Sequence, residues 1–234
     1  LNHSYRGKNK ITDVLSFAMQ EMGEDAVLVN ESGTAAGYFF EYPRQELYFA
    51  NSCGFLGWGL GAAIGAKLAM PERKVVACVG DGSFILGMQS LWSSVKYNLP
   101  ITVVVFNNGC YMAIKASLYW HGGRAAQQPD LIGMGSDLGE PVVDFARIAE
   151  GFGGVGERVE SPEQIRLAVR RAMNAERLAV IDVLVDPREA DLERGKLSVA
   201  SPIGRGVLGK HEGDVVEVTT PAGVRRYRIE KVEA

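Results

Sequence analysis

Two short polar segments, each directly after an apolar run, hold the residues best suited to bind a ligand. Asp81 stands between two glycines after one run, and Asn107-Asn108 follow the next run. Carboxylate and amide oxygens suit Mg²⁺ or Ca²⁺, and Mg²⁺ usually completes its coordination with phosphate and water. Gly82 and Ser83 would open the following helix, whose N-terminus favours an anion. The pair of segments therefore indicates a metal and diphosphate site, although the Gly-Asp-Gly segment by itself is more typical of a turn.

The elements that must position these residues alternate between buried strands and amphipathic helices. Near-continuous apolar runs predict strands over 74–79, 101–106 and 179–185. Ser83 is expected to cap a helix whose apolar face runs to Val95, and Ser161 to open a capping box with Gln164. The alternation predicts an α/β fold with a doubly wound parallel sheet, in which the ends of neighbouring strands meet at one edge. The apolar positions of the two helices are Ile85, Met88, Leu91, Trp92 and Val95, and Ile165, Ala168, Val169, Ala172 and Met173.

The composition is that of an ordinary globular protein with balanced charge. Among 234 residues, 25 Lys+Arg oppose 28 Asp+Glu, which gives a formal net charge of −3. Such a chain has no overall positive field for nucleic acid, and no apolar run is long enough to span a membrane. Cys53, Cys78 and Cys110 are odd in number and widely spaced, which favours reduced thiols and a cytoplasmic protein. The three histidines never stand at zinc-ligand spacing.

The spacing from Asp81 to Asn107-Asn108 resembles the cofactor motif of thiamine diphosphate (ThDP) enzymes. The resemblance covers about residues 24–187 and is closest to the benzoylformate decarboxylase and acetolactate synthase group. It implies the diphosphate-binding domain of a 2-oxo acid decarboxylase or carboligase, in which the cofactor serves as an electron sink. Further segments that carry the resemblance are Asn30–Ser32, Gly54–Gly59, Ala62–Gly65 and Tyr97–Pro100.

The resemblance also implies a role for individual residues around the metal. The side chains of Asp81 and Asn108 would bind Mg²⁺, with the backbone carbonyl of Cys110 as the third protein ligand. Since the family uses a backbone atom there, the Cys110 thiol itself need not take part. Gly82 and Ser83 would hold the diphosphate.

Other positions would contact the rest of the cofactor. The backbone of Gly33 and Thr34 would help to hold the diphosphate, and the Gly54 carbonyl would meet the 4′-amino group of the pyrimidine. Leu56 would be the apolar wedge that keeps ThDP bent. Plain core packing is the alternative interpretation of Leu56.

The family's activating glutamate has no counterpart in this chain. In the family it lies on a separate pyrimidine-binding domain, commonly of another subunit, so we assign no catalytic residue and expect an oligomer. Glu31 and Glu41 lie within the diphosphate-domain segment and are not assigned that role. His121 is expected to be a loop residue in the stretch 111–123, which is placed over the site.

The first 23 residues resemble the bacterial rRNA-maturation endoribonucleases. The resemblance rests on Leu1-Asn2, Tyr5–Lys8 and Thr12–Phe17, and a short strand is expected over Asp13–Phe17. That family's metal site is a downstream cluster of three histidines, which the sequence lacks. Arg6 matches a functional arginine of the family and is expected here to be a solvated charge.

Residues 188–234 resemble the C-terminal end of the Gre-type transcript-cleavage factors. The alternation of apolar residues around Pro221–Gly223 predicts a β-hairpin in this segment. The acidic residues that place Mg²⁺ in RNA polymerase lie on an N-terminal coiled coil of that family, which the sequence lacks. The resemblance is carried by Gly195–Val199, Ser201–Arg205, Gly209-Lys210 and Glu212–Val218.

Three partial resemblances in one chain suggest a composite, and the first residue is Leu rather than Met. The leading hypothesis is a ThDP- and Mg²⁺-binding domain that acts on a 2-oxo acid only when a pyrimidine-binding domain or subunit is supplied. A module that binds RNA polymerase or RNA through the terminal segments is the second hypothesis. An inactive composite is the third.

Overall fold

The computed structural model of the chain describes residues 9–32, 44–50, 55–121, 135–186, 209–220 and 223–229. The chain divides into two compact units, Leu1–Glu189 and Ala190–Ala234. Within the described ranges, no helix is long and apolar enough to cross a membrane.

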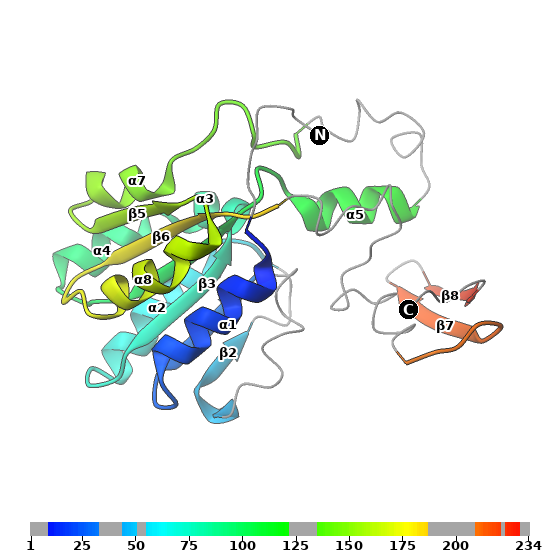
Figure 1. Cartoon of the computed structure of the whole chain (residues 1–234), viewed down its shortest axis with the longest axis horizontal. Coiled ribbons are helices and arrows are strands. Elements are labelled where there is room, and N and C mark those ends of the chain that lie inside the picture. The colour runs from blue at the N-terminus through cyan, green and yellow to red at the C-terminus, as the bar shows by residue number, and fades with distance from the viewer. Residues whose placement is uncertain are drawn as a thin grey trace. The chain divides into compact units, whose positions relative to one another are not determined.

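The first unit is built on a six-stranded sheet in which all neighbouring strands are parallel (Figure 1). The order across the sheet is β2-β1-β3-β4-β6-β5. This arrangement confirms the predicted α/β class. The strands are β1 (Val27–Glu31), β2 (Tyr48–Ala50), β3 (Val75–Gly80), β4 (Thr102–Asn107), β5 (Val155–Val159) and β6 (Ala179–Leu184).

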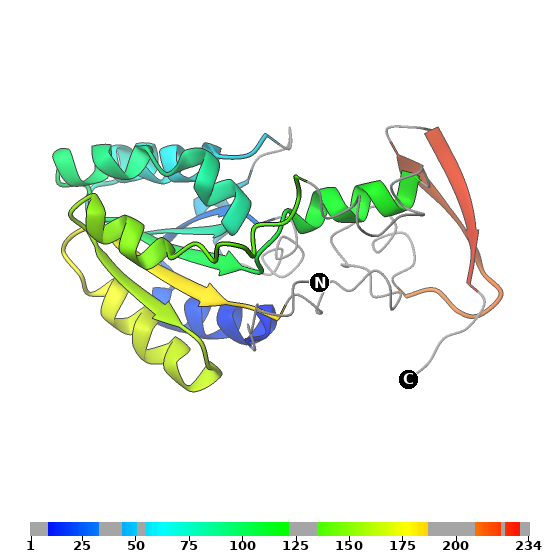
Figure 2. The ribbon, with the colours of Figure 1, turned by 90° about the horizontal axis from the view of Figure 1, so that it is seen from above.

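Helices cover both faces of this sheet, with α1 and α8 on one face and α2 and α4 on the other (Figure 2). Because both faces are covered, β4 and β6 are buried along their whole length. The helices are α1 (Ile11–Met22), α2 (Trp58–Ala69), α3 (Asp81–Gly87), α4 (Ser90–Lys96), α5 (Met112–His121), α7 (Phe145–Gly151) and α8 (Pro162–Met173), with a 3₁₀ turn η2 (Gln45–Leu47).

The short strand predicted over Asp13–Phe17 is wrong, because this segment lies within helix α1. The apolar residues of α1 recur at helical rather than strand spacing, and the helix buries them against the rest of the unit. α1 packs on α8, and an ion pair of 2.8 Å joins Glu21 to Arg170. Residues with the endoribonuclease resemblance therefore form part of the α/β core. The buried side chains of α1 are Ile11, Val14, Leu15, Ala18 and Met22.

The single helix predicted from Ser83 to Val95 is also wrong, because the structure has two helices, α3 and α4, with a break between them. Gly80 rather than Ser83 stands at the N-cap of α3. The break follows Gly87, where a Cβ would lie 2.6 Å from the Gly57 carbonyl oxygen. This close approach requires glycine, which is a poor helix former.

Helix α8 begins as the sequence predicts. The side chain of Gln164 accepts a hydrogen bond of 3.2 Å from the Ser161 N–H, and the reciprocal bond to the Ser161 side chain completes the capping box. Proline occupies the first helical position. The five predicted apolar positions of this helix are all buried.

Asn9 joins the segment before α1 to the sheet. Its side-chain Nδ2 donates to the carbonyls of Leu184 (2.8 Å) and Val159 (3.3 Å), the last residues of β6 and β5. Its backbone carbonyl oxygen accepts a hydrogen bond of 2.9 Å from the Asp186 N–H. Asn9 is fully buried, so these bonds hold the start of α1 to the carboxyl ends of two strands.

The second unit contains the predicted hairpin, formed by the antiparallel strands β7 (Val215–Thr220) and β8 (Gly223–Arg228). Glu217 lies directly opposite Arg226, and the two form an ion pair of 2.6 Å. Residues 221–222 of the predicted turn lie outside the described ranges.

Candidate functional site

A cavity of about 510 Å³ opens at the carboxyl ends of β1, β3 and β4. It is lined by the predicted residues Asp81, Ser83 and Asn108, together with residues of α5. β1 has β2 on one side and β3 on the other, so the cavity lies where the order of strands along the chain reverses. Ligands of parallel α/β sheets bind at such points.

Asp81 is a buried carboxylate at the start of α3, only 3% exposed. Its Oδ1 accepts the Gly82 N–H at 2.8 Å, and its Oδ2 accepts the N–H groups of Asn108 (3.1 Å) and Cys110 (3.2 Å). Burial raises the pKa of this carboxyl to about 7, and the backbone N–H groups oppose that rise. No cationic side chain of the described residues pairs with Asp81.

The Asn108 and Asp81 side chains converge on the same backbone group. The Cys110 N–H lies 3.1 Å from Asn108 Oδ1 as well as 3.2 Å from Asp81 Oδ2. The Cys110 carbonyl accepts the N–H of Met112 at 2.9 Å. Burial raises the pKa of the Cys110 thiol to about 12, so at neutral pH it is not a thiolate nucleophile.

The first turn of α3 forms one wall of the cavity. The Ser83 hydroxyl donates to the Glu31 carbonyl at 3.3 Å. The Tyr111 ring lies against Gly82, where a Cβ would be 2.2 Å from the ring atom Cε1. Any side chain at position 82 would have to displace that ring.

Leu56 contributes an apolar side chain to the cavity lining, next to Phe55. It is 42% exposed, so its side chain is not enclosed in the core. Three other predicted contact residues, Gly33, Thr34 and Gly54, lie outside the described residues, as does Glu41.

Glu31 holds the N-terminus of α2 to the end of β1. Its carboxylate accepts the N–H of Gly59 at 2.6 Å and also the N–H of Gly57. Gly57 has a φ of +92°, and a Cβ there would lie 2.9 Å from the Leu86 backbone, so no larger residue fits. These bonds give Glu31 a structural role.

The described part of the stretch 111–123 contains a helix at the site rather than a loop. Residues 112–121 form α5, so the loop predicted around His121 is wrong for the backbone. Met112, Ile114 and Leu118 of this helix line the cavity. The His121 side chain lies outside the described part of the structure.

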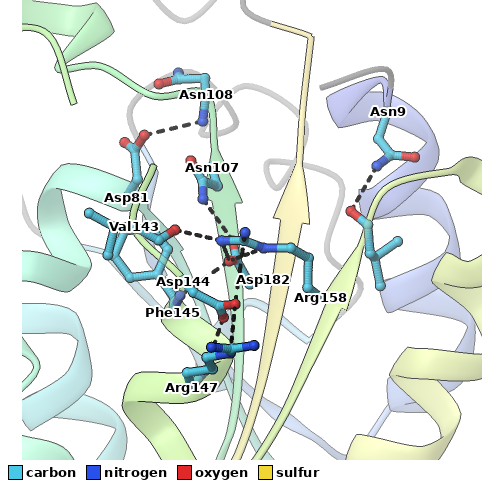
Figure 3. A network of polar contacts seen from close by, with 11 residues as sticks. Asn9, Asp81, Asn107, Asn108, Val143, Asp144, Phe145, Arg147, Arg158 and Asp182 are labelled. Carbon is cyan, nitrogen blue, oxygen red and sulfur yellow. Dashed lines mark hydrogen bonds and ion pairs between the residues drawn. The ribbon is translucent and has the colours of Figure 1, made fainter. Parts of the chain in front are cut away.

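Two supports of the site were not predicted from the sequence. The segment 136–138 braces the loop after β4, because the Tyr111 N–H donates to Ser136 O at 2.8 Å and the Leu138 N–H to Gly109 O at 2.7 Å. Asp182, fully buried in β6, accepts hydrogen bonds from Asn107 and Arg158 (Figure 3). A single acidic residue in the apolar run 178–185 was a signal for the second support, since unpaired carboxylates are almost never fully buried.

The chemistry of this donor set fits a hard divalent cation. Asp81 supplies a buried carboxylate that lacks a cationic partner among the described side chains, and Asn108 supplies an amide oxygen beside it. A cation between them would compensate the desolvated negative charge.

The middle of the chain matches the family model "Thiamine pyrophosphate enzyme, C-terminal TPP binding domain" over residues 31–183. A second model, "Transcription elongation factor, GreA/GreB, C-term", matches residues 183–234. Neither of these two matches includes residues 1–23, so the endoribonuclease resemblance of that segment remains a prediction.

Individual relatives agree with the first of these models. A benzoylformate decarboxylase from Pseudomonas aeruginosa is 35% identical over 164 residues, which is 68% of this chain and 29% of that protein. An acetolactate synthase from Bacillus subtilis is 36% identical over 149 residues, 64% of this chain and 24% of that protein. The chain thus spans less than a third of the length of these relatives.

A solved structure shows the same fold. The thiamine diphosphate-dependent 4-hydroxybenzoylformate decarboxylase of Rhodococcus jostii RHA1 superposes with a TM-score of 0.64 and 33% sequence identity. The match covers 74% of this chain and 32% of that one.

Asp81 should make the ligand-free protein less stable as the pH rises. Its folded-state pKa of about 7 exceeds the ordinary 3.8. Between these values the folded state holds a proton that the unfolded state has lost, so stability falls as the pH rises through this window. At about 1.4 kcal/mol per pH unit, the free energy of unfolding should drop by about 3 kcal/mol between about pH 5 and 8, relative to Asp81→Ala.

Urea titrations of both proteins at the two pH values measure this drop. Asp25→Ala, which removes an exposed carboxylate, serves as the control and should change with pH as the wild type does. If wild type and Asp81→Ala differ by the same amount at both pH values, the raised pKa is contradicted.

A comparison of Leu56 with Leu60 tests whether Leu56 is an apolar wedge in the cavity or part of the packed core. Leu56 is half-exposed whereas Leu60 is fully buried. Leu56→Ala should therefore lower the free energy of unfolding of the ligand-free protein by less than about 1 kcal/mol, and Leu60→Ala by about 2–5 kcal/mol. Equal losses in chemical denaturation would assign Leu56 to the core.

Proposed function

The chain belongs to the thiamine pyrophosphate enzymes through their C-terminal TPP binding domain, and on this premise we propose that its cavity binds thiamine diphosphate together with Mg²⁺. The proposal is carried by one observation. The oxygens of Asp81 and Asn108 converge on a single N–H at a cavity whose lining, except for Asn30, belongs to the matched segment.

Asp81 and Asn108 would hold the metal through their side-chain oxygens. Both oxygens now accept backbone N–H groups of the loop after β4, so metal binding exchanges these hydrogen bonds for coordination. The Cys110 carbonyl, from the same loop, is the proposed third protein ligand. Mg²⁺ prefers such oxygen donors and completes its octahedron with phosphate oxygens and water.

The first turn of α3 would receive the diphosphate. Gly82 leaves room for a close approach to the backbone, and the Tyr111 ring now lies in that space. A diphosphate held by Gly82 and Ser83 would displace this ring. The exposed, apolar Leu56 would contact the thiamine itself, with the backbones of Gly33, Thr34 and Gly54 as further contacts.

The proposed activity is that of a 2-oxo acid decarboxylase or carboligase. When bound, the cofactor supplies the electron sink for such chemistry. The chain's own residues bind and orient the cofactor. Glu31 is engaged with the amides of Gly57 and Gly59, which makes it unsuited to the role of the activating glutamate. In the family that the sequence resembles, this glutamate lies on a pyrimidine-binding domain. We therefore propose that turnover requires a pyrimidine-binding domain or subunit, and that this chain alone is weakly active or inactive.

Cofactor binding is tested by isothermal titration of ThDP with Mg²⁺ into the whole chain. The wild type should bind, and omission of Mg²⁺ should remove most of the heat. Asp81→Ala and Asn108→Ala should each abolish or strongly weaken binding because they remove a metal ligand. Asp25→Ala should bind as the wild type does, since Asp25 is exposed and lies outside the cavity. Equal heats of binding for the wild type and Asp81→Ala would contradict the proposal.

The second unit supports a second candidate function, association with RNA polymerase. The specific observation is the match of residues 183–234 to the C-terminal model of the GreA/GreB elongation factors. The β7–β8 hairpin presents exposed charges of both signs, among them Glu217, Arg226 and Arg228. Such a surface favours a charged protein partner, and its contacts should weaken with salt.

Deletion of residues 190–234 tests this candidate. The full chain should co-elute with purified RNA polymerase at low ionic strength and lose it as salt is raised, whereas the shortened chain should not co-elute. The melting temperature of the shortened chain shows whether its first unit is intact. Undiminished association after the deletion would rule this function out.

A further inference from the structure

A buried carboxylate outside the cavity hydrogen-bonds to residues of β4, α7 and β5. Asp182 lies in the middle of β6 and is fully buried. It accepts hydrogen bonds from Asn107 Nδ2 (2.9 Å), from the Phe145 N–H (3.2 Å), and from Arg158 Nε (3.0 Å) and Nη2 (2.6 Å). Figure 3 shows these groups gathered around one side chain, below the loop that carries Asn108.

The first connection leads to the loop after β4. Asn107 is the last residue of β4, and its side chain is held by Asp182 while its carbonyl accepts the Val185 N–H at 2.8 Å. The next residue, Asn108, donates its N–H to Asp81. Since Asn107 is fixed through both side chain and backbone, the direction in which the loop leaves the strand is fixed as well.

The second connection leads to α3. The Phe145 N–H is held by Asp182 at the start of α7. The Phe145 ring packs against Phe84 with a centroid distance of 4.9 Å and an interplanar angle of 59°. Phe84 is fully buried and directly follows Ser83 in the first turn of α3. The same carboxylate therefore supports the helix start that carries Asp81, Gly82 and Ser83.

Arg158 keeps Asp182 in one position. Its guanidinium makes two hydrogen bonds to the carboxylate and a third, of 2.5 Å, to the Val143 carbonyl, and Asp144 lies 3.8 Å away. A buried ion pair contributes little net stability compared with an apolar replacement of similar volume. In the otherwise apolar strand β6, this pair is therefore better explained by the geometry it imposes than by stability.

We propose that Asp182 is a positioning residue for the cofactor site, acting through Asn107 on the metal-binding loop and through Phe145 and Phe84 on the first turn of α3. This inference rests on the proposed function. Asp182 would touch neither metal nor cofactor, and its removal would weaken binding by loosening the ligands.

The test compares two variants of the whole chain with a matched control. Asn107→Ala removes the connection to the loop and leaves the Asp182–Arg158 pair intact, whereas Asp182→Asn removes the charge at nearly constant volume. Glu157→Gln is the control. Glu157 lies on β5 beside Arg158 and, like Asp182, pairs with an arginine, but its pair with Arg171 is at the surface. Mg²⁺ is titrated calorimetrically at a fixed, saturating concentration of ThDP.

Both variants should weaken Mg²⁺ binding about 10- to 100-fold, as the loss of groups that orient metal ligands does, and the control should stay within about twofold. Variants that fold and bind Mg²⁺ as tightly as the wild type would overturn the inference, even if they melt at a lower temperature. If Asp182→Asn does not fold, the Mg²⁺ affinity of Asn107→Ala alone decides whether the inference holds.

A second readout needs no ligand. Amide hydrogen exchange at Asn108 and Cys110, whose N–H groups now bond to Asp81, should be faster in Asn107→Ala than in the wild type and in Glu157→Gln. Unchanged exchange at both amides would overturn the inference. If the wild type bound no Mg²⁺ and ThDP, the proposed function would fail, while the exchange rates would still decide whether this network positions the loop.

Discussion

The burial of both faces of the parallel sheet governs where this protein can place polar chemistry. β3, β4 and β6 lie between helices, and nearly every side chain along them is enclosed. Functional polar groups are therefore concentrated at the carboxyl ends of the strands, where Asp81 and Asn108 follow β3 and β4. The exception is Asp182, a carboxylate within a strand, and its burial requires the four donor groups that surround it.

Close backbone contacts complete the site. Gly57 and Gly87 let α2 and α3 approach each other, and Glu31 binds the first amides of α2. Helix α3, which begins with the proposed metal ligand Asp81, is thereby held from two sides, by α2 and by Phe145 of α7. A ligand site assembled from separate loops gains accuracy when rigid elements support each loop.

Strands β3, β4 and β6 and the capping box of α8 were predictable because continuous apolar runs and a Ser-Pro-Glu-Gln start are local signals. The convergence of Asp81 and Asn108 was predictable too, because parallel neighbouring strands end at the same edge. The short run Asp13–Phe17 predicted a strand because so few residues do not separate strand from helix; the 3.6-residue spacing that continues through Ala18 and Met22 belongs to helix α1. The break after Gly87 depends on a close contact with Gly57, and the burial of Asp182 depends on its pairing with Arg158. Local sequence patterns do not contain such distant pairings.

The central claim is that Asp81 and Asn108 hold a metal that anchors a diphosphate. A crystal structure of the chain grown with ThDP and Mn²⁺ in place of Mg²⁺ tests this most directly, because anomalous scattering locates the metal. The account predicts a metal about 2.0–2.3 Å from oxygens of Asp81 and Asn108 and from the Cys110 carbonyl, with the diphosphate completing its coordination. A metal bound elsewhere, with Asp81 still accepting the N–H groups of Asn108 and Cys110, would contradict it.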